Sequence, residues 1–298
     1  MGGDNTSKRV LFTGGTGFVG RNTLPVLEAC GRCEVFAPRR AELNLFSPEE
    51  VRAYVADNAI DVVFHAANPN ASKNDLDSDA TLYQDSMRMF MPVYECRDLV
   101  ERVVYLGSGA ELDKRRDLAR VGEEAFGESM PVNDYGQAKY VQMLLAQGAE
   151  NVHNLRLFAC FGPFDHWTKF ITHCIRSVLA GVEITIRQDC RFDYLHVSDF
   201  ARVIAWSLDA PLAYKDYNVG SGKSHLLSEI ATMVVGAMGS DLPVRVLNEG
   251  LNREYTPNVD RLSAESGLVE GFLSLEEGIA LQIAHEKEVY PPGGYDRV

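Results

Sequence analysis

Apolar and polar residues follow two alternating patterns along the first half of the chain. Short continuous apolar runs, such as the one within Asp61–His65, are typical of strands buried on both faces. Longer amphipathic stretches separate them, and Ser47-Pro48-Glu49-Glu50 has the cap, the proline and the early acids that start a helix. The predicted strands are residues 9–13, 34–37, 61–65, 102–106 and 154–158, and the predicted helices are residues 18–30, a helix beginning at 47–50, 79–99 and 132–148. This alternation predicts an α/β fold, a Rossmann-type doubly wound parallel sheet with helices on both faces.

After about Phe161 the alternation becomes less regular. We expect helices near residues 167–180, 198–208, 224–238 and 274–287, and short strands near residues 183–187, 191–197, 216–219 and 243–247. The pattern predicts a first domain over residues 1–161, to which about residues 191–220 return, and a smaller α/β region over residues 162–298. Residues 291–294, Pro-Pro-Gly-Gly, are expected to form a loose tail.

Charge and composition exclude several classes of protein. The 298 residues carry a formal net charge of −13, which disfavours a nucleic-acid partner because such proteins need a basic surface. The apolar runs are much shorter than the ~20 residues of a membrane helix, and the first residues lack the apolar core of a secretory signal. We therefore expect a cytoplasmic protein with no nucleic-acid or membrane partner.

The cysteines do not form a recognisable metal-binding pattern. Cys30 and Cys33 have CxxC spacing, but a second CxxC that would complete a zinc site is missing from the sequence. We expect no bound metal, and we interpret the six cysteines as buried, reduced thiols.

A glycine-rich loop joins the first predicted strand to the first predicted helix. Glycines fall at positions 14, 17 and 20, where they permit a tight turn, close approach of a pyrophosphate and close packing of the helix on the strand. The helix N-terminus then offers N–H donors and a positive dipole to phosphate groups. This context predicts a dinucleotide site formed by Gly14, Gly15, Thr16, Gly17, Phe18 and Val19.

The residues after the second strand bear on the choice between NAD and NADP. An acid that would bind the ribose 2′-hydroxyl is absent from the end of this strand, which runs into Arg39 and Arg40. Two arginines can hold a 2′-phosphate, so NADP(H) is favoured. NAD(H) stays open, because the adjacent Glu42 can act as a displaced acid.

Tyr135 and Lys139 are four residues apart and therefore share one face of the predicted helix. A free tyrosine has a pKa of ~10, and a drop of ~3 units costs ~4 kcal/mol. An ammonium ~4 Å away at an effective dielectric of ~20 supplies about that much. The pair therefore predicts proton transfer by Tyr135, with Lys139 also holding the nicotinamide ribose.

Ser108 follows the fourth strand, at the sheet edge that faces the ligand in folds of this type. Its hydroxyl can donate to a substrate carbonyl and stabilise the developing oxyanion. The alternative is an ordinary turn serine.

These motifs, with five others, resemble the NAD-dependent epimerase/dehydratase family, the extended short-chain dehydrogenases that act on nucleotide sugars. The further segments are Phe64–Ala67, Asn154–Pro163, Phe192–Asp199, Tyr217–Gly220 and Ser274–Ile279. The resemblance covers nearly the whole chain, and its nearest likeness is to GDP-fucose synthases through Arg40–Ser47, the stretch that in those enzymes meets the adenosine 2′-phosphate.

The resemblance implies further site residues. It adds Asn44, Leu45, Ala66, Ala67 and Ser86 to the cofactor site, and it suggests a substrate site with Asn68, Ala110, Phe161, Lys169 and Arg191. The acid and base that epimerise the sugar in GDP-fucose synthases would fall at Ala110 and near Lys169. Alanine cannot serve as either group, so the resemblance leaves reduction intact and puts epimerisation in doubt.

The sequence therefore predicts an NADPH-dependent 4-keto reductase of a nucleotide-linked deoxy sugar. An NAD-dependent nucleotide-sugar 4-epimerase is the alternative enzyme, and a nucleotide-sensing regulator on the same fold is an alternative of another class. The family also implies a homodimer formed through the helices near residues 79–99 and 133–149.

Overall fold

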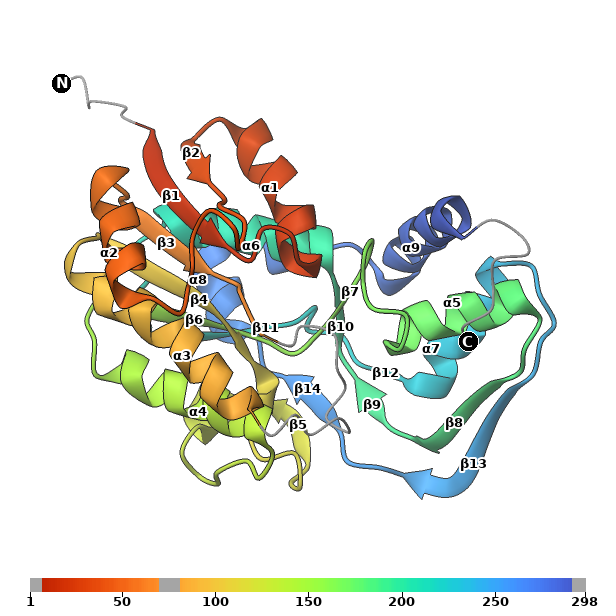
Figure 1. Cartoon of the computed structure of the whole chain (residues 1–298). Helices are drawn as coiled ribbons and strands as arrows, with labels where there is room; N and C mark the ends of the chain where they lie inside the picture. The colour runs from red at the N-terminus through yellow and green to blue at the C-terminus, as the bar shows by residue number, and fades with distance from the viewer. Residues whose placement is uncertain (1–6, 70–80, 291–298) are drawn as a thin grey trace. The chain divides into compact units, whose positions relative to one another are not determined.

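The largest sheet has six strands in the order β11-β6-β4-β3-β1-β2 (Figure 1). Its strands are β1 (Lys8–Thr13), β2 (Cys33–Phe36), β3 (Val62–His65), β4 (Arg102–Ser108), β6 (Val152–Leu157) and β11 (Asp216–Val219). β1 pairs in parallel with β2 and β3, and β3 pairs in parallel with β4. This parallel sheet with helices between its strands confirms the predicted Rossmann-type α/β fold.

The computed structural model describes residues 7–69 and 81–290, which form two compact units. The first unit comprises Met1–Asp113, Phe126–Arg156 and Ala201–Tyr217, and the second comprises Lys114–Ala125, Leu157–Phe200 and Asn218–Val298. The predicted tail at residues 291–294 lies outside the described residues. Among the described residues, none of the helices is long and apolar enough to cross a membrane.

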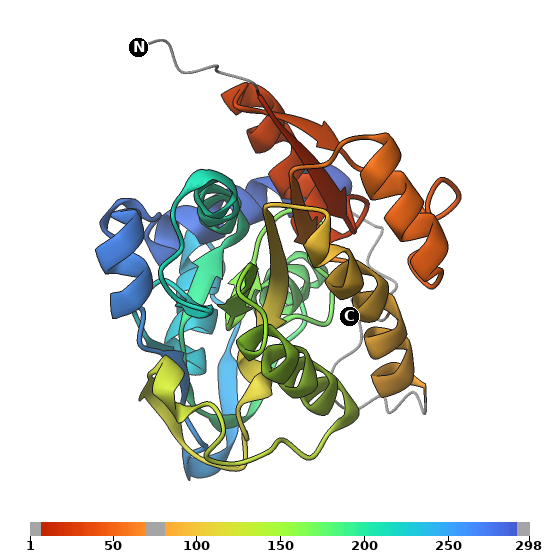
Figure 2. The same ribbon diagram turned by 90° about the vertical axis from the view of Figure 1, so that its left-hand side faces the viewer.

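Helices pack on both faces of the large sheet. They are α1 (Phe18–Cys30), α2 (Pro48–Asp57), α3 (Leu82–Glu95), α4 (Asp134–Gln147) and α6 (Val197–Asp209). Figure 1 shows α2, α3 and α4 along one face and α1 on the other, and Figure 2 shows α3 and α4 side by side. The predicted dimerisation through α3 and α4 stays a prediction.

The helix predicted over residues 79–99 ends earlier than expected. Its first two residues lie outside the described residues, and α3 ends at Glu95, followed by the 3-10 helix η1 (Cys96–Asp98). Pro92 lies in the last turn of α3, where it cannot donate a backbone hydrogen bond to the preceding turn.

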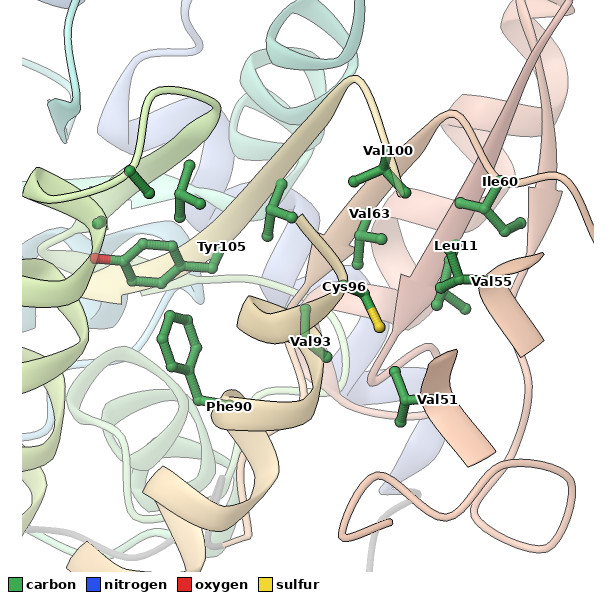
Figure 3. Packing of buried hydrophobic residues seen from close by; sticks show 14 of the residues in the cluster. Leu11, Val51, Val55, Ile60, Val63, Phe90, Val93, Cys96, Val100 and Tyr105 are labelled. Carbon is green, nitrogen blue, oxygen red and sulfur yellow. The ribbon is translucent and has the colours of Figure 1, made fainter. Parts of the chain in front are cut away.

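One hydrophobic core lies between the sheet and helices α2, α3 and α4. In Figure 3, Leu11, Val63 and Tyr105 from three strands face Val51 from α2 and Phe90 from α3. These side chains are fully buried or nearly so. The continuous apolar runs of the strands are therefore needed, because each strand packs side chains on both faces.

The second unit contains three small sheets around its own core. Its strands are β5 (Leu118–Val121), β7 (Ala159–Phe161), β8 (Ile184–Asp189), β9 (Arg191–Phe192), β10 (Tyr194–His196), β12 (His225–Leu226), β13 (Val244–Leu251) and β14 (Tyr255–Pro257). They form the sheets β10-β7, β12-β9-β14-β5 and β13-β8. Its helices are α5 (Phe170–Ala180), α7 (Leu227–Ala237), α8 (Asp260–Ser266) and α9 (Leu275–Val289), and α5, α7 and α9 enclose the core.

The single strand predicted over residues 191–197 is wrong, because the chain forms two short strands, β9 and β10, on either side of Asp193. The Asp193 carboxylate is buried and accepts hydrogen bonds from the Ser221 amide, the Ser221 hydroxyl and the Gly222 amide, at 2.7, 2.8 and 2.7 Å. These hydrogen bonds attach the chain between β9 and β10 to the loop that contains Ser221 and Gly222.

We predict that Phe90→Ala lowers the free energy of unfolding by about 3–5 kcal/mol, because it leaves a cavity in a close-packed core. Phe90 is fully buried and lies 5.1 Å from the Tyr105 ring and 5.9 Å from the His65 ring, centroid to centroid. Urea denaturation followed by circular dichroism measures the change. Val132→Ala, at a side chain that is 58% exposed, is the control, and equal losses in both variants would contradict the assignment of this core.

Candidate active site

The glycine loop forms a narrow cradle at the ends of β1 and β3. Gly14 has a φ of +80°, and a Cβ there would lie 2.7 Å from the Ala67 amide nitrogen, so only glycine is accommodated. A Cβ on Gly20 would lie 2.5 Å from the Gly14 carbonyl oxygen, which brings α1 close to the loop. The Gly17 amide donates to the Gly14 carbonyl at 3.0 Å, and the first turn of α1 carries no acidic side chain. This cradle fits a dinucleotide pyrophosphate.

The end of β3 is attached to the same loop. The Thr13 hydroxyl lies 2.8 Å from His65 Nδ1 and accepts a hydrogen bond from the Ala67 amide at 3.4 Å. The Ala66 amide donates to the Thr13 carbonyl at 3.2 Å. Ala66 and Ala67 therefore lie beside the glycine loop, where the family resemblance expects the cofactor.

The two arginines after β2 differ in their surroundings. Arg39 pairs with Glu42, whose carboxylate accepts from the Arg39 guanidinium at 3.1 Å and from its amide at 2.7 Å. Arg40 is exposed, and Asn44 is also exposed, with its side-chain oxygen accepting from the Phe46 amide. The hydrogen bond and charge of Glu42 raise the pKa of Arg39, so Arg39 is a cation that already has a partner.

Tyr135 and Lys139 lie one turn apart near the start of α4. The Asn133 side chain caps this helix by accepting from the Gly136 amide at 2.7 Å. A Cβ on Gly136 would lie 2.6 Å from the Ala110 carbonyl oxygen, so the first turn of α4 packs directly on the 3-10 helix η2 (Gly109–Glu111) that follows Ser108. The structure thus packs the first turn of α4, which carries Tyr135, against the segment that follows Ser108.

Ser108 ends β4 and caps η2. Its hydroxyl oxygen accepts a hydrogen bond from the Ala110 amide at 3.1 Å, and its own amide donates to Glu111 Oε1 at 2.9 Å. Because the hydroxyl accepts, its proton can still be donated to a ligand. Ala110 itself is 2% exposed, so its side chain is buried beneath the segment that follows Ser108.

Lys139 is buried, and its ammonium donates to the Leu106 carbonyl at 2.7 Å. Burial lowers the pKa of Lys139 to about 8, and the charge of Glu111 opposes this shift. Burial, helped by the Lys139 charge, lowers the pKa of His65 to about 3, so this histidine is neutral at pH 7. The chain therefore holds a buried cation one helical turn from Tyr135.

Ser86 lies on α3, which packs against α4. It is 4% exposed, and within the described residues its hydroxyl has no hydrogen-bond partner. Its carbonyl accepts from Gln142 of α4 at 3.5 Å. The predicted contact of this hydroxyl with the cofactor stays a prediction.

The expected substrate residues are divided between the units. Asn68 follows β3 in the first unit and is half-buried. Phe161, Lys169 and Arg191 belong to the second unit. Phe161 is 1% exposed and packs against Tyr194 and His196, whereas Lys169 precedes α5 and Arg191 lies on β9, both half-buried.

Glu111 and Asp165 are among the buried carboxylates that the sequence did not single out. Glu111 is fully buried beneath Ser108, and Asp165 is 8% exposed in the loop after β7. Burial raises the pKa of Asp165 to about 7, and within the described residues its Oδ2 has no hydrogen-bond partner. The position of each within a few residues of the end of a strand is the sequence signal that points to them.

The interpretation of all six cysteines as buried thiols was wrong for three of them. Cys30, Cys33 and Cys160 are only partly buried, whereas Cys96, Cys174 and Cys190 are buried; Cys30 ends α1 and Cys33 begins β2, where side chains are less covered. Burial and the neighbouring Cys30 raise the pKa of Cys33 to about 11, which disfavours the reactive thiolate. In the part of the chain that the structure describes, no cluster of three or more metal-ligating side chains is found.

Three known proteins share this architecture or sequence. The ADP-L-glycero-D-manno-heptose-6-epimerase of Pseudomonas paraeruginosa is 25% identical, over 91% of this chain and 96% of its own. The GDP-L-fucose synthase of Azorhizobium caulinodans is 25% identical, over 78% of this chain and 81% of its own. The GDP-mannoheptose C4 reductase of Campylobacter jejuni, a structure with NADP bound, superposes with a TM-score of 0.78 at 19% identity, over 96% of this chain and 100% of its own.

The model of the NAD dependent epimerase/dehydratase family matches residues 10–220. This range contains the glycine loop, Ser108 and the Tyr135–Lys139 pair, and it covers most of the chain. The chain therefore belongs to the NAD dependent epimerase/dehydratase family of extended short-chain dehydrogenases and is an NAD(P)-dependent enzyme.

Proposed function

We propose that this enzyme is an NADP(H)-dependent reductase of the 4-keto group of a nucleotide-linked deoxy sugar. The observation that supports this reaction best is the packing of the first turn of α4, which carries Tyr135, on η2, the segment that follows Ser108, with the buried Lys139 ammonium one turn further along α4. A proton donor, a hydroxyl that can orient an oxygen and a fixed cation are what carbonyl reduction needs.

Each of the three side chains has a separate task. A bound nicotinamide cofactor supplies the hydride. Tyr135 gives its phenolic proton to the carbonyl oxygen of the substrate. Ser108 orients that oxygen by donating its hydroxyl proton, and Lys139 holds the ribose and stabilises the tyrosinate that remains.

The cofactor site would consist of the glycine cradle, the end of β3 and the segment after β2. Gly14–Val19 and the N-terminus of α1 would bind the pyrophosphate, and Ala66, Ala67 and Ser86 would line the nicotinamide side. Arg39, Arg40, Asn44 and Leu45 would surround the adenosine 2′-phosphate. The exposed Arg40 is the cation best placed for this contact, because Arg39 is already paired with Glu42.

The relatives support a nucleotide sugar as the substrate. The names of the heptose epimerase, the fucose synthase and the C4 reductase all describe nucleotide-linked sugars or enzymes that make them. Asn68, Ala110, Phe161, Lys169 and Arg191 are the proposed substrate residues. With Ala110 where the resemblance to GDP-fucose synthases expects an acid-base group, reduction without epimerisation is the simplest chemistry.

The alternative enzyme is an NAD-dependent 4-epimerase. The Arg39–Glu42 pair favours it, because the pair partly neutralises the arginine that would otherwise hold a 2′-phosphate. A nucleotide-sensing regulator on this fold would not need the Tyr135–Lys139 pair.

Absorbance of NADPH during incubation with nucleotide-linked 4-keto sugars separates these functions. NADPH consumption in proportion to the sugar supports the reductase. Interconversion of sugars without net consumption would favour the epimerase, and cofactor binding without turnover of any sugar would favour the regulator.

We predict that Tyr135→Phe lowers kcat by about 10²–10⁴-fold, because the phenolic proton is lost while the ring remains. NADPH binding, measured by fluorescence titration, should stay unchanged. Tyr140→Phe is the matched control: its ring stacks on Phe126 at 4.6 Å, and the variant should keep the rate of the wild type. Similar rates in both variants would contradict the role of Tyr135.

We also predict that Arg40→Ala weakens NADPH binding by about tenfold, because a charge-assisted hydrogen bond to the 2′-phosphate is lost. NADH binding should change little. Arg52→Ala, which removes a surface pair with Asp98, is the control for loss of a positive charge. If wild-type protein binds NADH more tightly than NADPH, the choice of NADP(H) is wrong.

A further inference from the structure

A fully buried carboxylate lies directly beneath Ser108. Glu111 is 0% exposed, and its Oε1 accepts from the Ser108 amide at 2.9 Å. Its Oε2 accepts from Asn154 Nδ2 at 2.9 Å and from Arg156 Nε at 2.8 Å. All three partners are N–H donors, so both oxygens act as acceptors, as those of an ionised carboxylate do.

The carboxylate also contacts the end of the strand that carries Ser108. A Cβ on Gly107 would lie 2.5 Å from Glu111 Oε1, so the backbone of β4 is packed against this oxygen. Arg156, which is also 0% exposed, reaches on to Asp216 with a second bond of 2.6 Å. The position of Ser108 is therefore linked through Glu111 to β6 and β11.

The charges around this site balance one another. Glu111 and Asp216 are negative, while Arg156 and Lys139 are positive. Burial raises the pKa of Glu111, whereas the charge of Arg156, the Ser108 amide and the charge of Lys139 oppose the rise. Tyr105 of β4 is also buried. Burial and the negative charge of Glu111 raise the pKa of Tyr105, so its phenol stays protonated.

Lys139 is surrounded by groups from several elements. The Leu106 carbonyl of β4 accepts a hydrogen bond from its ammonium, the charge of Lys139 helps to lower the pKa of the buried His65 of β3, and Tyr135 precedes Lys139 by one turn on α4. Burial lowers the pKa of Lys139, and the charge that opposes this effect is that of Glu111. With a neutral residue at position 111, the negative charge that opposes the effect of burial on the pKa of Lys139 would be lost.

We propose that Glu111 is a positioning residue of the active site, whose buried carboxylate holds the Ser108 backbone in place and balances the charge of the buried Lys139 ammonium. The consequence of this role for catalysis rests on the proposed function. The effect on Lys139 is a property of the protein without substrate, and it can be measured separately.

The decisive variant is Glu111→Gln, which keeps the shape of the side chain and removes its charge. In cofactor-free protein with ¹³C-labelled lysine, the NMR titration of Lys139, assigned with Lys139→Met, should move to lower pH by on the order of one unit. The alkaline limb of kcat/KM should move in the same direction, because loss of a negative charge favours loss of a proton from Lys139 or Tyr135. At a pH above the alkaline limbs of both the wild type and the variant, the kcat/KM of the variant should then be about tenfold lower.

Asp216→Asn is the matched control, because it removes a carboxylate from the same network on the other side of Arg156. It should leave the Lys139 titration and the alkaline limb in place. Glu111→Asp keeps the charge and shortens the side chain, so kcat should fall through the lost bond to the Ser108 amide while the limb stays where it is in the wild type.

A second variant covers the case in which Glu111→Gln does not fold. Glu111→Gln with Arg156→Gln removes one charge of each sign and still lacks the carboxylate, so a shift in the same direction is expected, smaller because loss of the Arg156 cation offsets part of it. Equal titrations of Lys139 in wild type and in these variants, or equal shifts with Asp216→Asn, would overturn the proposal. If the wild type consumes no NADPH with any sugar, the proposed function fails, and the lysine titration still decides the role of Glu111.

Discussion

The buried ion pair between Glu111 and Arg156 is the interaction on which the active site depends most. Both side chains are fully buried, and Arg156 also binds Asp216, so one guanidinium links the segment after β4 to β6 and β11. Taking these charges out of water costs several kcal/mol per ion, and the cost is offset only because nearly every oxygen and N–H is paired. Such a network is weak as a source of stability, but it specifies one position for the backbone around Ser108.

The same burial explains the electrostatics of the Tyr135–Lys139 pair. A lysine at the surface would be a strongly hydrated cation with little effect on its neighbours, whereas the buried Lys139 ammonium is held by a carbonyl and faces a neutral histidine. In these surroundings its charge is poorly screened, which strengthens its effect on nearby groups. The spacing of Tyr135 and Lys139 therefore describes only part of the site, since Glu111 supplies the charge that compensates the buried ammonium.

Regular patterns in the sequence predicted most of the large sheet and its helices. The helix over residues 18–30 and the strand over residues 216–219 have the bounds that were expected, because glycines and polar residues end them sharply. The strands β5, β7, β12 and β14 were not predicted, since segments of two to four residues are too short to show a period. The break between β9 and β10 depends on Asp193, whose partners lie about 28 residues later in the chain.

The sequence by itself determined the family, the parallel sheet, the glycine cradle and the helical pairing of Tyr135 with Lys139, because these features arise from residues close together in the chain. Only the tertiary structure decided that Glu111 lies under Ser108, that Arg156 joins it to Asp216 and that Lys139 is buried. These contacts span 45 and 60 residues, and each depends on which strands become neighbours in the sheet. Burial and hydrogen-bond partners are properties of the folded structure, so a carboxylate that lies buried under Ser108 looks in the sequence like any other glutamate.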